Sequence, residues 1–170
     1  TTTTLGSALS AIAISPLSTS KIYAGTSGGK IIVTTNNGAN WTSYITGNYV
    51  SDLIVDNIND NVCYAVFGGV SSNRISKTTD GGLNWTNISG NLPSIAINTI
   101  ALKTNGARMI FVGTDVGVYQ STNEGTSWVS FNTGMPSVQV YDLKYKSSLS
   151  LLLAATHGRG CLKFDLSSAS

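Results

Sequence analysis

Four glycine-containing loops hold the side chains best suited to chemistry. Asp115 is the only acid in these loops, His157 is the only histidine of the chain, and Arg159 follows it by two residues. Together with Arg74, these groups could bind a carboxylate or a sugar hydroxyl, because guanidinium and imidazole groups donate hydrogen bonds and a carboxylate accepts them. The alternative is that His157 and Arg159 only shape a turn through backbone hydrogen bonds. The loops are TSGGK (26–30), FGGVSSNR (67–74), TDVG (114–117) and THGRG (156–160).

Catalysis needs more groups than these loops supply. Glycoside hydrolysis usually requires two carboxylates about 5 to 9.5 Å apart, and Asp115 has no second acid in a neighbouring loop of the same type. One histidine and two distant cysteines form no zinc cluster, and no serine is paired with a base. We expect no metal and no cofactor, and we leave enzymatic activity open. The other acids in strand segments or their turns are expected to be solvated or to clamp turns: Asp52, Asp56, Asp60 and Asp142.

The composition limits the partners of the protein. Of 170 residues, 41% are apolar and only 11% are charged, and the net charge is +2. Lys and Arg do not cluster, so nucleic-acid binding is not expected. No apolar run approaches the ~20 residues that span a bilayer. The low charge favours an extracellular or cell-surface location, with the periplasm as another possibility. Cys63 and Cys161 lie in strand-like segments and are expected to be buried free thiols, with a disulfide as the alternative.

One short pattern occurs three times: TTNNGANW (34–41), TTDGGLNW (78–85) and STNEGTSW (121–128). Its tryptophans are 44 and 43 residues apart. An Asn or Asp oxygen can accept backbone N–H bonds inside a tight turn, and glycine permits a positive φ. The following indole can enter the layer between two sheets. The pattern therefore predicts a structural corner made of Asn36, Gly38 and Trp41, then Asp80, Gly82 and Trp85, then Asn123, Gly125 and Trp128.

The intervening segments predict short antiparallel strands and no helix. Runs such as IYAGT (22–26) and IFVGT (110–114) are rich in β-branched and aromatic residues and are bounded by turn residues. Four strands in about 43 residues fit one blade of a β-propeller. We predict an all-β propeller made of four units, 9–50, 51–94, 95–137 and 138–166, with residues 1–8 as an outer strand that completes a blade.

The repeated pattern resembles the Asp-box, or BNR repeat, of β-propellers. Sialidases, sortilin-type receptors, xyloglucan-degrading glycoside hydrolases and a photosystem II assembly factor carry such repeats. Two of the three corners have Asn where the family has Asp. The resemblance implies that ligands bind at the end of the blades opposite the corners, which is the end that holds the four loops named above. A sialidase would require an arginine triad, a tyrosine nucleophile and an acid, and the scattered Arg74, Arg108 and Arg159 do not match that triad.

The fourth unit contains three strand-like runs and no corner. Either four blades close on themselves, or the chain is a segment of a propeller with six to eight blades, completed by further blades or by a second chain. We interpret the protein as a non-catalytic, secreted or cell-surface binding module for a glycan or a protein. The alternatives are a segment of a xyloglucanase-like glycoside hydrolase, with Asp115 as one catalytic carboxylate, and an assembly factor or structural subunit of a larger complex.

Overall fold

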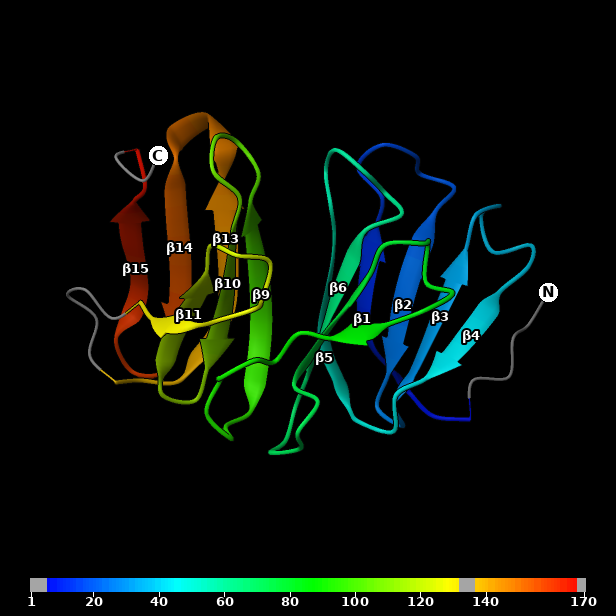
Figure 1. Cartoon of the computed structure of the whole chain (residues 1–170), viewed down its shortest axis with the longest axis horizontal. Helices are drawn as coiled ribbons and strands as arrows, with labels where there is room; N and C mark the ends of the chain where they lie inside the picture. The colour runs from blue at the N-terminus through cyan, green and yellow to red at the C-terminus, as the bar shows by residue number, and fades with distance from the viewer. Residues whose placement is uncertain (1–5, 132–136, 168–170) are drawn as a thin grey trace.

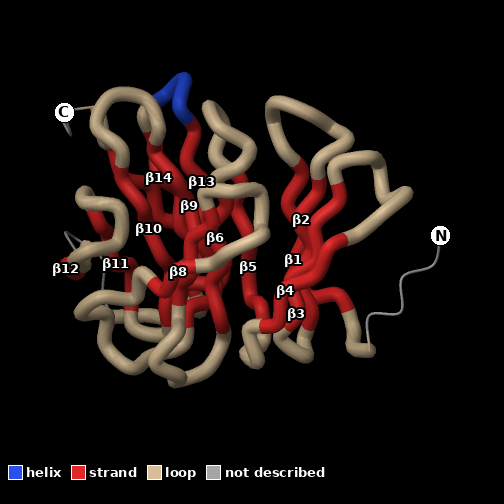
Figure 2. The backbone as a smooth tube through the Cα atoms, turned by 45° about the vertical axis from the view of Figure 1, so that its right-hand side comes forward, coloured by secondary structure: helices blue, strands red, loops and turns tan. Residues whose placement is uncertain are grey.

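The computed structural model describes residues 6–131 and 137–167. These residues form four antiparallel sheets, and the only helix among them is the short 3-10 turn η1 (Ser147–Leu149). Figure 2 shows strands throughout, with the loops gathered at the two ends of the strands. The all-β class predicted from the sequence is confirmed. No helix in the described part of the chain is long and apolar enough to cross a membrane.

Each sheet is one blade, with its strands in chain order. Three blades have four strands and the last has three in the described residues. Blade 1 consists of β1 (Leu9–Ile14), β2 (Ile22–Thr26), β3 (Lys30–Thr34) and β4 (Thr42–Ile45); blade 2 of β5 (Val50–Val55), β6 (Cys63–Phe67), β7 (Ile75–Thr78) and β8 (Thr86–Asn87); blade 3 of β9 (Ile97–Lys103), β10 (Met109–Thr114), β11 (Gly117–Ser121) and β12 (Val129–Ser130); and blade 4 of β13 (Val140–Lys146), β14 (Leu151–Thr156) and β15 (Gly160–Asp165).

The blades form an arc around their inner strands. β1, β5, β9 and β13 are successive neighbours and line a shared groove of about 350 Å³. Figure 1 shows β4 and β15, the outermost strands of the first and last blades, at opposite ends of the molecule. The first and last blades therefore point away from each other, as in an open part of a propeller.

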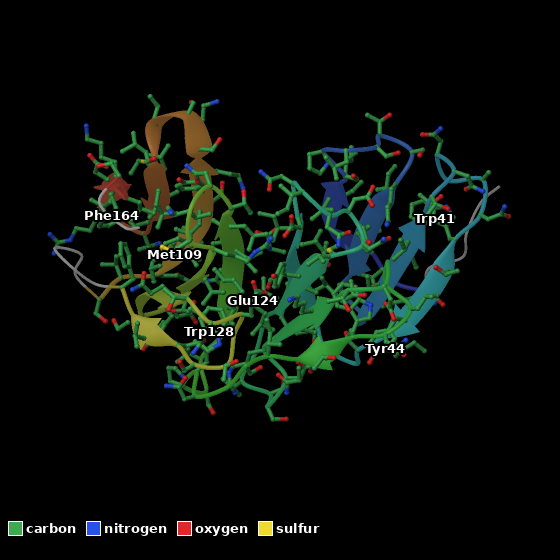
Figure 3. All side chains as sticks on the ribbon, turned by 45° about the horizontal axis from the view of Figure 1, so that its top comes forward. Trp41, Tyr44, Met109, Glu124, Trp128 and Phe164 are labelled. Carbon is green, nitrogen blue, oxygen red and sulfur yellow. The ribbon has the colours of Figure 1, made fainter. Side chains whose placement is uncertain are left out.

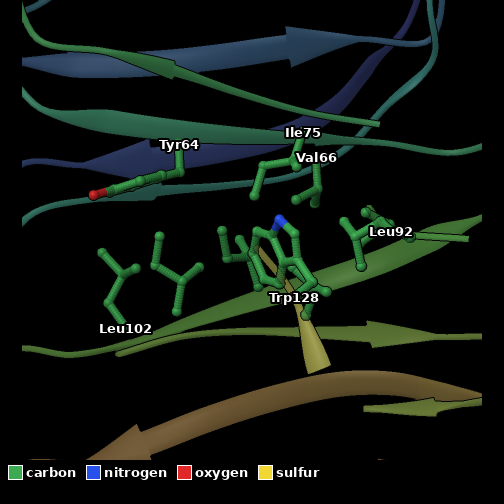
Figure 4. Close-up of a cluster of buried hydrophobic side chains, with 10 residues drawn as sticks. Tyr64, Val66, Ile75, Leu92, Leu102 and Trp128 are labelled. Carbon is green, nitrogen blue, oxygen red and sulfur yellow. The ribbon is translucent and has the colours of Figure 1, made fainter. Parts of the chain in front are cut away.

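The hydrophobic core consists of three seams, one between each pair of successive blades. In each seam the apolar side chains of one sheet face those of the next, as sheets do when they pack face to face. The central seam contains Tyr64, Val66 and Ile75 of blade 2 and the indole of Trp128 of blade 3, which is 3% exposed. Figure 4 shows this indole among those side chains. Large seam side chains thus hold each blade to its neighbour.

The three corners share one set of hydrogen bonds. In the second corner, the Thr78 hydroxyl donates to Asp80 Oδ1 (2.8 Å), the same oxygen accepts the Asn84 N–H (2.9 Å), and the Gly82 N–H donates to Thr78 Oγ1 (3.0 Å). Gly82 has a φ of 94°, which a residue with a Cβ would oppose. The same bonds occur at Thr34, Asn36, Gly38 and Asn40, and at Ser121, Asn123, Gly125 and Ser127.

Each corner places a tryptophan directly before the outer strand of its blade. The Trp85 ring lies 6.4 Å from that of Tyr44 in the first seam, and the Trp128 ring fills the second seam. Trp41 is only partly buried, and its side of blade 1 has no preceding blade. Figure 3 places it at the outer end of blade 1, beside β3 and β4.

Two details differ from the sequence-based expectations or extend them. Both cysteines are free thiols, but only Cys63 is buried; Cys161 is exposed, because it lies on the side of blade 4 that no further blade covers. Residues 6–8 form no strand, and Ser7 and Ala8 bond to the β2–β3 loop of their own blade. Residues 1–5 lie outside the described residues, so completion of a blade by this segment stays a prediction.

Candidate functional site at the loop end of the blades

Asp115 lies in the β10–β11 loop, and its carboxylate is held by two amide side chains. Asn98 Nδ2 and Gln139 Nε2 donate to the same oxygen, Oδ1, at 3.0 and 2.8 Å. The residue is exposed, so the second oxygen can accept a hydrogen bond from a ligand. Because Asn98 belongs to blade 3 and Gln139 precedes blade 4, the carboxylate is fixed at the junction of the two blades.

His157 lies on the other side of Gln139. Its backbone N–H donates to the Gln139 carbonyl (2.9 Å), and its Nδ1 is 2.8 Å from the hydroxyl of Tyr141. The two rings meet edge to face, with centroids 5.8 Å apart. Tyr141 is 52% exposed, so it presents an aromatic face to solvent. The structure therefore brings Asp115, Tyr141 and His157 together, with Gln139 between them.

The two arginines of the candidate set are placed differently. Arg159 is exposed in the same β14–β15 loop as His157 and can reach a ligand at this end. Arg74 is 6% exposed and donates from its guanidinium to the carbonyls of Ser71 (2.9 Å) and Leu92 (2.6 Å). These bonds hold the β6–β7 loop that carries Arg74, and the structure does not bring Arg74 to Asp115 or His157.

Hydrogen bonds between successive inner strands connect the blades at this end. Each inner strand has a bulge near its start, and the bulged residue points toward the next blade. Ser10 donates to the Val50 carbonyl at 2.7 Å, and Ser51 donates to the Ile97 carbonyl at 2.6 Å. Asn98 repeats this contact with Val140 at 3.1 Å. Tyr141 occupies the same position in blade 4 and instead contacts His157.

A second set of contacts between blades lies in the central groove. Asp52 Oδ2 accepts the Thr99 hydroxyl (2.9 Å) and the Ile100 N–H (3.1 Å) of the next blade. Thr99 in turn accepts the Leu143 N–H (3.2 Å) of the blade after it. Burial raises the pKa of Asp52 above its usual value, although these donors act in the opposite direction. Sequence reasoning treated Asp52 as a solvated end or turn clamp, whereas it connects two blades.

The remaining acids have structural partners. Asp56 is buried, accepts the backbone N–H groups of Ile58 (2.8 Å) and Asn59 (3.2 Å), and pairs with Arg108. Asp60 pairs with Lys21 at 3.2 Å. Asp142 pairs with Lys144 at 2.8 Å and is half exposed. In the described residues, no second carboxylate contacts Asp115, and no group of three or more His, Cys, Asp or Glu side chains could hold a metal.

Comparison with known proteins rests on structure. No family model and no curated protein matches the sequence. An ancestral GH74 enzyme superposes with a TM-score of 0.75 at 18% identity, over 92% of this chain and 25% of that chain. The GH74 xyloglucanase from Xanthomonas campestris gives 0.73 at 15%, over 95% and 30%. YCF48 bound to a D1 peptide gives 0.65 at 11%, over 97% and 52%.

The fold is a β-propeller. This β-propeller chain spans between a quarter and about half of the length of the structures it matches. At these identities the likeness shows the fold alone. The chemistry of the site therefore rests on the residues themselves, which offer one fixed carboxylate, one imidazole and one exposed phenol ring. This combination can accept and donate hydrogen bonds and can pack against a flat or apolar group.

Proposed function

We propose that this propeller chain is a non-catalytic binding module whose ligand, a protein or a glycan, docks at the loop end of blades 3 and 4. The observation that carries the proposal is the fixed Asp115 carboxylate beside the exposed pair Tyr141 and His157. Its two amide donors orient the carboxylate before a ligand arrives, so little ordering is required on binding. A secreted or cell-surface location remains part of this proposal, supported by the low charge of the sequence.

A protein segment fits this surface better than a glycan. Val70 and Val116 are exposed on neighbouring loops of the same end, at 71% and 37%. Aliphatic side chains contact apolar side chains of a protein but give no stacking face for a sugar ring. The Asp115 carboxylate can accept backbone N–H groups or a lysine or arginine of that segment. Docking on a larger complex, as an assembly factor does, would use the same contacts.

Substitution of Asp115 tests this proposal. We expect the purified chain to bind members of a peptide array, and Asp115→Asn to weaken that binding by about tenfold or more, because hydrogen bonds to a charged group contribute about 1.5 to 3 kcal/mol. Asp165→Asn is the matched control, since Asp165 is exposed on another part of blade 4 and accepts a hydrogen bond from the Ser167 N–H. Equal binding by Asp115→Asn and the control would refute the site.

The alternative activity is glycoside hydrolysis, which the likeness to GH74 enzymes supports at the level of fold. The same variant distinguishes it. Release of reducing sugars from xyloglucan that disappears in Asp115→Asn but not in Asp165→Asn would replace the binding proposal with an enzymatic one. Binding to a glycan panel without release of sugar, lost in Asp115→Asn, would keep the binding module and assign it a glycan.

A further inference from the structure

The turn between β9 and β10 contains one of the two Asn-Gly pairs of the chain, Asn105–Gly106; the other is Asn37–Gly38. The side-chain amide of an asparagine can react with the backbone nitrogen of the next residue. Glycine has no Cβ, so it leaves that nitrogen open to approach. Asn105 and Gly106 are both exposed. The groups around each pair therefore decide whether it reacts.

The polarity of the β9–β10 turn is the reverse of that in blades 1 and 2. Strand register makes Lys103 equivalent to Ser15 and Asp56, because each directly follows the same position of its inner strand. The side chains of Ser15 and Asp56 each accept two backbone N–H groups of their own turns. Lys103 Nζ instead donates to two carbonyl oxygens of its turn, those of Asn105 (2.8 Å) and Ala107 (3.2 Å). In blade 3 the carbonyl groups of the turn are thus the ones that are bound.

The backbone nitrogens of the two Asn-Gly pairs differ for this reason. The Gly106 N–H has no acceptor in the described part of the chain. The Gly38 N–H donates to Thr34 Oγ1 at 2.9 Å inside the first corner. A proton held in such a bond is lost less readily. Gly106 therefore offers an accessible nitrogen, and Gly38 does not.

Lys103 stabilises the reactive form of the Gly106 nitrogen. The carbonyl of Asn105 belongs to the same peptide group as that nitrogen, so loss of the proton places part of the negative charge on the carbonyl oxygen. The Lys103 ammonium donates to this oxygen at 2.8 Å. Lys103 is 3% exposed and forms no ion pair within the described residues, so no acid weakens its effect.

The side-chain amide of Asn105 is held by blade 4. The Tyr145 hydroxyl donates to Asn105 Oδ1 at 2.7 Å, and Asn105 Nδ2 donates to the Ser147 carbonyl at 3.5 Å. Attack on Cγ places negative charge on Oδ1, and a donor already in position stabilises that charge. The turn thus combines an accessible nitrogen, a cation that stabilises its deprotonated form and a hydroxyl that stabilises the attacked amide.

We propose that Asn105 is a site of spontaneous modification in the folded protein, through a succinimide ring formed with Gly106. The Gly106 nitrogen gives its proton to water and forms a bond to Asn105 Cγ. The bond between Cγ and Nδ2 breaks, and Nδ2 takes a proton from water and leaves as ammonia. Water then adds to one of the two carbonyls of the ring and breaks the bond of that carbonyl to nitrogen, which gives aspartate or isoaspartate. Water is the only co-reactant.

Lys103 also favours one of the two products. Addition of water to the carbonyl that Lys103 contacts leaves the α-carboxylate beside Nζ and gives isoaspartate. Addition to the carbonyl that Tyr145 contacts gives aspartate. An ammonium group is the stronger donor of the two, so isoaspartate should be the main product. Either product adds one negative charge beside Lys103. The reaction is independent of the ligand proposed above, because it takes place at the opposite end of the blades.

Ageing of the purified chain at neutral pH tests the proposal. We expect mass spectrometry of digests to find the modification at Asn105, with isoaspartate in excess, and a much slower reaction at Asn37, the internal control. Lys103→Met should slow the reaction about tenfold, which corresponds to about 1.4 kcal/mol in the barrier. It should also lower the share of isoaspartate, whereas Lys103→Arg, which keeps a charged donor, should restore most of the rate. Tyr145→Phe should slow the reaction without lowering that share.

Unfolding separates the effect of the folded turn from that of the bare Asn-Gly pair. In guanidinium chloride, Asn105 and Asn37 should react at similar rates, and the substitutions at Lys103 and Tyr145 should have no effect. Thermal melts show which variants are folded during ageing. Equal rates at Asn105 and Asn37 in the folded chain, or a folded Lys103→Met variant that reacts as fast as wild type, would overturn the proposal. If Lys103→Met does not fold, an unchanged rate in folded Tyr145→Phe would overturn it instead.

Discussion

Truncation of Trp128 should destabilise the fold far more than the same change at Trp41. Both residues follow equivalent corners, so backbone geometry and local sequence are matched. Trp128 is 3% exposed, and its Nε1–H donates to the Ile88 carbonyl at 3.0 Å. Trp41 is partly exposed on the uncovered face of blade 1.

The magnitude follows from what each indole loses. Removing a buried aromatic side chain costs about 3 to 5 kcal/mol when a cavity remains, and the Ile88 carbonyl also loses its donor. Trp41→Ala removes only the apolar area that blade 1 itself covers, so this substitution should cost about 1 to 2 kcal/mol. The expected difference of about 2 kcal/mol or more is a large part of the stability of a small domain.

Urea unfolding followed by circular dichroism measures both values. The comparison requires equal m-values. Equal destabilisation by the two variants would refute the conclusion that blade 2 covers the Trp128 indole and that no blade of the described residues covers the Trp41 indole.

Three further outcomes are expected. The pKa of Asp80 is lowered to about 2, chiefly by the Asn84 N–H, so the stability that the Asp80 carboxylate contributes is present above its ordinary pKa and is lost as pH falls from about 4 to 2. The acid unfolding profile of Asp80→Asn should therefore be flatter in this range, and an unchanged profile would contradict the role of Asp80 in the corner. Gly113→Ala should lower the free energy of unfolding by about 1 to 3 kcal/mol, because a Cβ there would lie 2.6 Å from Thr99 Cγ2 and 2.8 Å from Val140 Cγ1. Gly69→Ala places its Cβ in open space and should cost less, through its φ of 102° alone, and thermal melts of the two variants test this difference. A thiol reagent should modify Cys161 rapidly and Cys63 only on unfolding, because Cys161 is exposed whereas Cys63 is completely buried and burial raises its pKa. Rapid modification of both would show that the first seam is open.

Much of the fold could be predicted because its signals are local. The corner at Asp80 is completed by bonds within seven residues, from Thr78 to Asn84, so its residue types and spacing are visible in the sequence. Runs rich in β-branched and aromatic residues and the 43- and 44-residue intervals then indicate repeated sheets. The hydroxyl of Thr78, which receives the Gly82 N–H, is part of the same pattern, although its role was not predicted.

The candidate site could be predicted only in part. Asp115 and His157 stand out as the acid and the histidine of the loops, but the sequence gives no sign of Gln139, which joins them across a blade boundary. The structure also places Tyr141 in solvent against His157, and this contact depends on how the start of blade 4 lies beside the β14–β15 loop. Arg74 has the residue type of a ligand-binding group, yet its burial among backbone carbonyls depends on how one loop folds back.

The sequence alone determined the strands, the corners and the repeat, because these depend on backbone preferences and on hydrogen bonds between residues a few positions apart. Only the tertiary structure decided which face of each blade is covered. Asp52 and Ile100 are 48 residues apart, and Trp128 bonds to Ile88 across 40. Such contacts depend on how one whole sheet packs on the next. The same packing leaves Ile12 63% exposed, whereas the residues at the same register position of the other blades, Leu53, Ile100 and Leu143, are 4%, 2% and 1% exposed.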